Sequence, residues 1–195
     1  MEDEQLSIFD SDGHLTGTTS RSDAHKKGLW HETFHCWFIE VEKNKTFIHF
    51  QLRSPDKKDF ANMLDITAAG HLTSEESVED GVREIKEELG ISLNLDDLMY
   101  AGMISDEIII GDFIDRELCH IFIYRIPAGT KPDYVFQDKE VSGIVKIERS
   151  EFEKIWSEEL ASVVINGKSV SKNNFVPHEN SYITSVMDSI RQYVL

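Results

Sequence analysis

The stretch AAGHLTSEESVEDGVREIKEELGI, residues 68–91, decides the fold. It contains six Glu and one Asp but only two basic residues. Four apolar residues recur at the spacing of one helical face: Val78, Val82, Ile85 and Leu89. Gly90 follows where a left-handed residue often ends a helix. The pattern predicts a helix from about Ser77 to Leu89, capped either by Ser77 with Asp80 or by Thr73 with Glu76.

Three of the carboxylates share one sector of this helix. Glu84, Glu87 and Glu88 are neighbours because residues three and four apart lie side by side on a helix. Acidic helix faces are often simply solvated, and Arg83 and Lys86 could ease the repulsion. Oxygen ligands clustered on one rigid element are also what Mg²⁺ or Mn²⁺ binds. The spacing alone does not decide between these interpretations.

The composition predicts one cytoplasmic domain spanning residues 1–195. No apolar run approaches the roughly 18 residues that cross a bilayer, and the acidic start MEDEQLSIFD is no secretory signal. Two Cys form no disulfide framework, which favours a reducing compartment. The formal net charge of -16 opposes binding to a nucleic acid polymer. A phosphorylated ligand would therefore need cations or a few well-placed basic residues.

The rest of the chain predicts strands around a few helices, without regular alternation of the two. The expected strands cover residues 6–9, 33–41, 45–54, 98–110, 117–126 and 140–148. A helix begun by Ser150 and a helix over the last fifteen or so residues make up the C-terminal part, about 150–195. This order predicts an α+β architecture with a mixed sheet.

The sequence REIKEELGI, which begins at Arg83, matches the second half of the Nudix box, R-E-U-x-E-E-x-G-U with U aliphatic, at every specified position. The first half of the box has Gly, five residues, Glu and seven residues before the Arg. Counting from Gly70 reaches Glu76 but leaves only six residues before Arg83. Counting back from Arg83 selects Glu75 and places Ala69 where the Gly belongs. We prefer this second register because it keeps both spacings.

The resemblance to the Nudix superfamily implies the fold and the chemistry. The expected Nudix fold is a mixed sheet packed between helices, an α/β/α sandwich, with the box at about residues 69–91. The resemblance implies hydrolysis of a nucleoside diphosphate-linked or related diphosphate with Mg²⁺ or Mn²⁺. In this role Glu84, Glu87 and Glu88 match the catalytic metal ligands of the family. Glu88, or a later residue such as Glu140, is the expected general base.

The segments LTGTTSRSDAHKKGLWHETFHCWFI and DITAAGH resemble the branch that contains isopentenyl-diphosphate isomerase and hydrolase-like relatives. The isomerase holds a metal with three His and two Glu. The positions that match here are His25, His31, His71, Asp115 and Glu117. This set suits a second site for Zn²⁺ or Mn²⁺ better than one for Mg²⁺. The remaining histidines are expected to be surface or packing residues: His14, His35, His49, His120 and His178.

One position argues against isomerase chemistry. The isomerase transfers protons with a Cys just before the Gly-His, and this chain has Ala69 there. A methyl group transfers no proton, and neither Cys36 nor Cys119 replaces the missing thiol in the sequence. We therefore predict a hydrolase, with isopentenyl-diphosphate isomerase as the alternative. A non-catalytic nucleotide-binding Nudix module is a third hypothesis, against which the complete Glu set argues.

Basic residues complete the predicted site. The resemblance implies that Arg53 and Lys57 contact the diphosphate, and Arg can bind phosphate oxygens bidentately. Arg83 is expected to pair with carboxylates of its own helix or the adjacent loop, and so to orient the metal ligands. The expected partner is a small-molecule diphosphate, with no nucleic acid polymer and no membrane. The sequence leaves the oligomeric state open, and a homodimer is possible because homodimers are frequent in the family.

Overall fold

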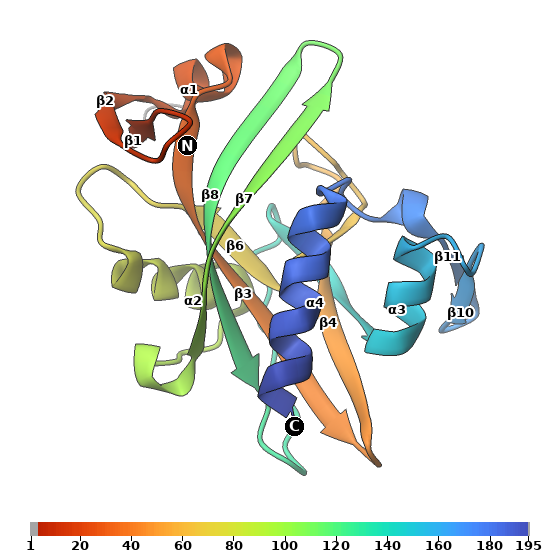
Figure 1. Ribbon diagram of the computed structural model, residues 1–195. Coiled ribbons are helices and arrows are strands. Elements are labelled where there is room, and N and C mark those ends of the chain that lie inside the picture. Colours follow the sequence, from red (N-terminus) through yellow and green to blue (C-terminus); the bar gives the residue numbers. More distant parts are fainter. Residues whose placement is uncertain (1–3, 195) are drawn as a thin grey trace.

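The computed structural model of the chain describes residues 4–194, which contain one nine-stranded mixed sheet (Figure 1). The sheet contains β1 (Gln5–Phe9), β2 (Leu15–Ser20), β3 (Trp30–Glu42), β4 (Lys45–Arg53), β5 (Leu64–Asp65), β6 (Ala68–His71), β7 (Met99–Ile110), β8 (Phe113–Arg125) and β9 (Val141–Glu148). A separate hairpin joins β10 (Val163–Ile165) to β11 (Lys168–Val170). The α+β architecture expected from the sequence is confirmed.

The long central strand β3 organises the sheet. One edge of β3 pairs in parallel with β8. The other edge pairs antiparallel with β1, then β6 and then β4. The turn to β4 is the two-residue Lys43-Asn44, whose φ angles of 47° and 65° are those of the tight hairpin turn that matches strand twist. This arrangement brings the start of β3 beside β6 and β8, where the candidate site lies.

The helices cover both faces of the sheet (Figure 1). The helical elements are α1 (Arg21–Lys27), η1 (Val78–Val82), α2 (Arg83–Leu89), η2 (Leu95–Asp97), α3 (Arg149–Trp156), η3 (Lys172–Asn174) and α4 (Asn180–Val194). Side chains of a strand alternate between faces. Phe34 and Phe38 of β3 thus pack in the cluster that contains Ile85 and Leu89 of α2.

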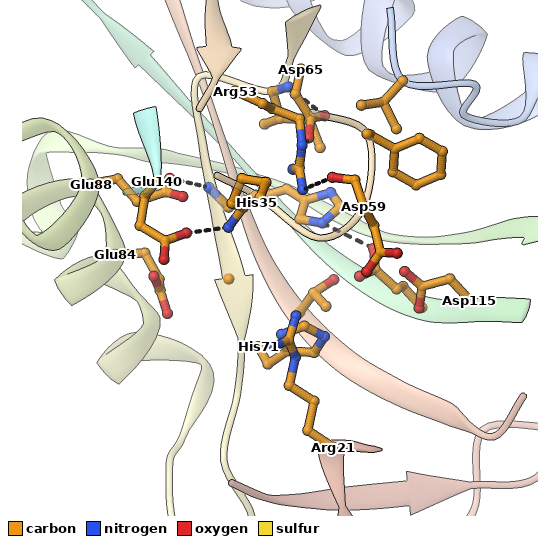
Figure 2. Close-up of a pocket in the computed structure, with 18 of the residues that line it drawn as sticks. Arg21, His35, Arg53, Asp59, Asp65, His71, Glu84, Glu88, Asp115 and Glu140 are labelled. Carbon is orange, nitrogen blue, oxygen red and sulfur yellow. Dashed lines mark hydrogen bonds and ion pairs between the residues drawn. The ribbon is translucent and has the colours of Figure 1, made fainter. Parts of the chain in front are cut away.

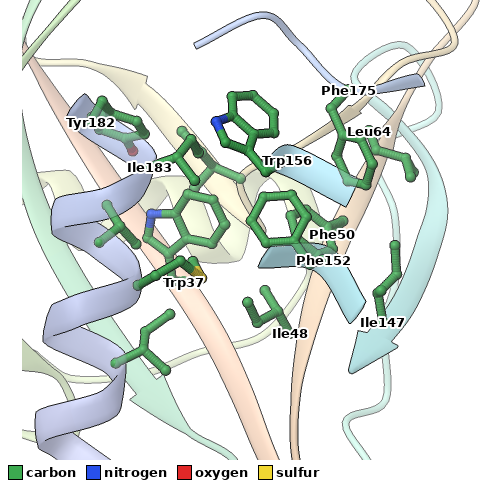
Figure 3. Close-up of a cluster of buried hydrophobic side chains, with 14 of the residues drawn as sticks. Trp37, Ile48, Phe50, Leu64, Ile147, Phe152, Trp156, Phe175, Tyr182 and Ile183 are labelled. Carbon is green, nitrogen blue, oxygen red and sulfur yellow. The ribbon is translucent and has the colours of Figure 1, made fainter. Parts of the chain in front are cut away.

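The alternate residues of β3 form the second core. Trp37 and Ile39 pack with α3 and α4 on the opposite face of the sheet (Figure 3). In that cluster Phe50 contacts Phe152 at a ring-centroid distance of 4.8 Å, and Trp156 is buried. The two cores make the expected α/β/α sandwich. No helix within residues 4–194 is long and apolar enough to cross a membrane.

The box helix differs from its prediction. Residues Val78–Val82 form the 3-10 helix η1, and the α-helical part begins only at Arg83. Both candidate capping pairs are present, because Asp80 accepts from the Ser77 N–H and Glu76 accepts from the Thr73 N–H.

Other boundaries also differ. No sequence pattern predicted α1, although Ser20 caps it and Gly28 ends it with φ 59°. The helix α3 covers only Arg149–Trp156, and Glu148, not Ser150, is its N-cap. The strand β8 begins at Phe113, so only Gly111 and Asp112 connect it to β7. Such ends depend on local hydrogen bonds that residue periodicity does not specify.

Candidate active site

One cavity of about 330 Å³ collects most of the predicted residues (Figure 2). It is lined by His25, Arg53, Lys57, His71, Arg83, Glu84, Glu87, Glu88, Asp115 and Glu117. These residues come from helices and strands that are distant in sequence and meet around the start of β3. The predicted ligand His31 is fully buried beside the cavity wall.

The box carboxylates differ in their surroundings. Glu88 is buried and accepts hydrogen bonds from the Ala69 N–H at 3.0 Å and from Gln51 Nε2 at 3.3 Å. Burial, reinforced by the charge of Glu84, raises the pKa of Glu88 to about 8. Burial likewise raises the pKa of Glu84 to about 7. One buried and one partly buried carboxylate with raised pKa values form a site where a cation would favour the charged forms. Glu87 is more exposed and lies 3.1 Å from Arg83 Nη1.

Arg83 forms ion pairs with two of these carboxylates at the edge of the site. Its guanidinium donates to Glu84 and Glu87 of its own helix and to Glu76 of the preceding loop. A further bond from Nη2 reaches the backbone carbonyl of His71 at 3.2 Å. The structure therefore brings together the helix, the loop and the end of β6 around one side chain.

The structure corrects the register of the box. Glu76 forms the ion pair with Arg83, which lowers the pKa of Glu76 to about 2, whereas Glu75 is exposed. A Cβ added at Gly70 would collide with the Glu84 carboxylate, so any larger residue here would displace that carboxylate. This geometry favours the register that begins at Gly70 and Glu76 over the predicted register that begins at Ala69 and Glu75. The missing residue lies between Glu76 and Arg83, where a 3-10 helix rises more per residue than an α-helix and can span the gap.

The three predicted histidines meet in space. His25 comes from α1, His31 from the start of β3 and His71 from the end of β6, and each pair of rings has a centroid distance of 5.1 Å. Asp115 Oδ1 lies 3.7 Å from His25 Nε2 and 3.6 Å from His31 Nε2. The pairing of β3 with β8 places Glu117 directly opposite His31. Asp115 lies two residues before Glu117 on the same face of β8, so its carboxylate is also near the histidines.

The chemistry of this cluster fits a bound transition metal. Burial lowers the pKa of His25 to about 4 and holds the pKa values of His31 and His71 below their ordinary value. The imidazoles are therefore neutral, which is the form that binds metals. His31 Nε2 and Asp115 Oδ1 are buried without a hydrogen-bond partner. A cation bound by both would satisfy these atoms.

Glu117 has a partner, His35, that was expected to be a surface or packing residue. His35 Nε2 lies 3.2 Å from Glu117 Oε2, while His35 Nδ1 lies 2.7 Å from the hydroxyl of Tyr182 in α4. Burial opposes ionisation of Glu117, yet the hydrogen bond from His35 lowers its pKa below the ordinary range. His35 is two residues from Thr33 and four from His31 on the same face of β3, a period-2 signal that was present in the sequence.

Comparison with known proteins agrees with this geometry. The chain is 43% identical to an uncharacterised Nudix hydrolase of Clostridium acetobutylicum, over 97% of this chain and 98% of the relative. The chain belongs to the Nudix hydrolase family. The chain is an enzyme that hydrolyses diphosphate bonds, and Nudix hydrolases generally use divalent metal ions.

Other similar proteins share part of their length or only the fold. Nudix hydrolase 3 of Arabidopsis thaliana is 29% identical over 86% of this chain, which spans 22% of that protein. A crystal structure from Deinococcus radiodurans superimposes with a TM-score of 0.58 at 19% identity, covering 87% of this chain and 94% of the other. No protein-family model matches the chain. The relation of this Nudix hydrolase to the isomerase branch remains a prediction.

The cationic side of this Nudix hydrolase cavity includes predicted and missed residues. Arg53 Nη1 donates to Asp65 Oδ2 at 2.7 Å, and Lys57 forms an ion pair with Glu140. Arg21, at the start of the unpredicted α1, also lines the cavity, and its buried Nε has no hydrogen-bond partner. No sequence motif marked Arg21. Only the packing of α1 against the sheet brings this side chain to the cavity.

Proposed function

We propose that this protein is a divalent-metal-dependent hydrolase of a nucleoside diphosphate-linked or related diphosphate, built like the isomerase branch. The observation that carries the proposal is the shared cavity. Its wall holds the box carboxylates Glu84 and Glu88 together with the cations Arg53 and Lys57. Such a cavity can bind a diphosphate both through metal ions and through direct contacts with basic side chains.

The box residues would hold Mg²⁺ or Mn²⁺. When bound there by Glu84, Glu87 and Glu88, such ions supply charge neutralisation and lower the pKa of a water molecule. Glu88 is the proposed general base, because its carboxylate is buried in the cavity beside Glu84, and bound cations would hold it in the charged form that accepts a proton. Glu140 is the weaker candidate, since it already pairs with Lys57. Arg83 keeps Glu84 and Glu87 oriented by donating to both.

A second site would hold Zn²⁺ or Mn²⁺ through His25, His31 and His71, with Asp115 and Glu117. The neutral imidazoles and the two partnerless buried atoms support this assignment. Histidine nitrogens with carboxylate oxygens are ligands that suit these ions. His35 orients Glu117 toward the cluster by occupying one of its oxygens.

The structure offers no support for isomerase chemistry. Ala69 lines the cavity, where it presents a methyl group, and its N–H is already donated to Glu88. Cys36 and Cys119 are fully buried, and burial raises the pKa of each thiol. Neither thiol lines the cavity.

The test is hydrolysis of a panel of nucleotide and prenyl diphosphates by the purified protein with Mg²⁺ or Mn²⁺. We expect Glu88→Gln to lower kcat about 10²- to 10⁴-fold, the usual contribution of a general base. Glu79→Gln is the matched control, because Glu79 is exposed on η1 and does not line the cavity. Unchanged activity of Glu88→Gln would refute its assignment. Migration of the double bond of isopentenyl diphosphate would instead establish the isomerase.

A further inference from the structure

We propose that His178 is a positioning residue, which keeps the guanidinium of Arg53 in place in the cavity by binding the carboxylate of Asp65. Through this contact the segment before α4 would determine how the site binds a diphosphate. The inference rests on the proposed function, because it takes Arg53 to be a diphosphate ligand.

His178 lies between two buried carboxylates. Its Nδ1 is 2.6 Å from Asp106 Oδ2 on β7, and its Nε2 is 2.9 Å from Asp65 Oδ1 on β5. Both acids and the imidazole are almost entirely shielded from solvent. Since each ring nitrogen faces a carboxylate oxygen, the doubly protonated imidazolium can donate to both. Burial opposes the charged form, but the two hydrogen bonds raise the pKa of His178 to about 10.

Asp65 passes this constraint to Arg53. One oxygen of Asp65 accepts from His178 and from the Ile66 N–H at 2.8 Å. The other oxygen accepts a hydrogen bond from Arg53 Nη1 at 2.7 Å, so both carboxylate oxygens of Asp65 have partners. Arg53 Nη2 donates to the carbonyl of Asp59 at 3.0 Å, which fixes the plane of the guanidinium. Arg53, Asp65 and His178 all line the cavity, and Figure 2 shows Arg53 beside Asp65.

Charge alternates along this series of contacts, from Asp106 to His178, Asp65 and Arg53. Without the imidazolium, Arg53 would be the one cation left beside two buried carboxylates in the series. Unpaired buried carboxylates are costly, so the guanidinium would be drawn toward them and away from a ligand. The expected consequence is weaker diphosphate binding. A residue that only anchors α4, for example by keeping Asp106 in place for the Glu179 N–H, would not act through Arg53.

A double-mutant cycle separates these two roles. Calorimetry would measure the Kd of inorganic pyrophosphate with Mg²⁺ for the wild type, Arg53→Gln, His178→Gln and the double variant. Loss of one charge-assisted contact predicts a Kd about tenfold higher for each single variant. We expect the double variant to bind no more weakly than Arg53→Gln, because both changes remove the same interaction.

His120→Gln is the matched control. His120 is also buried and lies 3.0 Å from the carboxylate of Glu32, but it does not line the cavity. Its replacement should leave the Kd within about twofold of the wild type, because surface and remote changes rarely couple to a site. His178→Lys keeps a positive donor between the carboxylates and should restore most of the affinity. This variant also serves if His178→Gln proves unfolded by circular dichroism.

The outcomes separate the two proposals. If the wild type neither binds pyrophosphate nor hydrolyses any diphosphate, the proposed function fails. If Arg53→Gln weakens binding but the folded His178 variants do not show the predicted Kd values, only the positioning role fails. Wild-type affinity of His178→Gln, additive losses in the double variant, or no rescue by lysine would each overturn it.

Discussion

At the scale of single residues, the site depends on small side chains as much as on charged ones. Gly70 leaves room for the carboxylate of Glu84, and Ala69 supplies an N–H to Glu88 while carrying no reactive group. These two neighbours therefore shape the acidic wall of the cavity without taking part in its charge.

Gly70→Ala should reduce catalysis more than stability. The new methyl group would displace the Glu84 carboxylate, a proposed metal ligand, and we expect kcat to fall by about tenfold or more. Gly143→Ala is the control, because nothing lies within 4 Å of a Cβ added there. The measurements are kcat and the Mg²⁺ concentration for half-maximal activity. Equal values for Gly70→Ala and the wild type would show that Glu84 is not needed in its present position.

The protonation of His178 predicts how stability depends on pH. The pKa of His178 rises from 6.5 to about 10 on folding, so the folded protein binds the proton more tightly than the unfolded chain. This contribution is fully present below pH 6.5 and is lost as the pH rises through about 10. The free energy of unfolding should fall across this window, by at most about 1.4 kcal/mol per pH unit. In His178→Gln, chemical denaturation at several pH values should show a flatter slope.

At the scale of elements, the end of α2 fixes the loop that leads to β9. The Val135 N–H donates to the Leu89 carbonyl at 2.9 Å, and the Gln137 N–H donates to the Glu88 carbonyl at 3.1 Å. The same loop carries Glu140, which lines the cavity. The helix that presents the proposed metal ligands thus also positions the cavity wall beside them.

Tyr134→Phe tests how firmly this loop is held. The Tyr134 hydroxyl lies 2.7 Å from His49 Nδ1, and its loss should destabilise the fold by about 1 kcal/mol. Amide hydrogen exchange should become faster in residues 134–140, where the loop would open more often. Tyr100→Phe is the control, since it removes the same kind of bond, from the Tyr100 hydroxyl on β7 to His120 Nδ1 at 3.2 Å, outside this loop. Unchanged exchange would mean that the backbone bonds to α2 suffice.

At the scale of the whole molecule, the histidine cluster links α1, β3, β6 and β8. A metal bound only by the folded chain stabilises it by mass action, about 2.7 kcal/mol at a hundred times Kd. Zn²⁺ or Mn²⁺ should therefore raise the melting temperature, and a chelator should lower it. His31→Gln should abolish the gain produced by Zn²⁺ and remove Zn²⁺ from the purified protein, whereas Glu84→Gln should not. Equal metal content in the wild type and both variants would contradict the second site.

Much of the fold was predictable because its determinants are local. The apolar stripe of residues 78–89 predicted a helix, and the apolar runs at residues 33–41 and 45–54 predicted two successive strands. The acidic residues of that helix, with the Arg and Gly of the box, were enough to indicate the Nudix family. The type of side chain and its spacing along the chain were sufficient for these conclusions, since neighbours on one helix or strand interact whatever the rest of the chain does.

Contacts across the chain decided the rest. Spacing favoured Glu75, but the ion pair with Arg83 and the crowding at Gly70 select Glu76. His178 reaches Asp106 across 72 positions of sequence, and nothing in its neighbours marks it as more than a packing residue. Hydrogen bonds and ion pairs form wherever folding brings donors and acceptors together. The order of residues therefore determined the helices, the strands and the family, whereas the packing of the sheet against α2 and α4 determined which charged side chains meet.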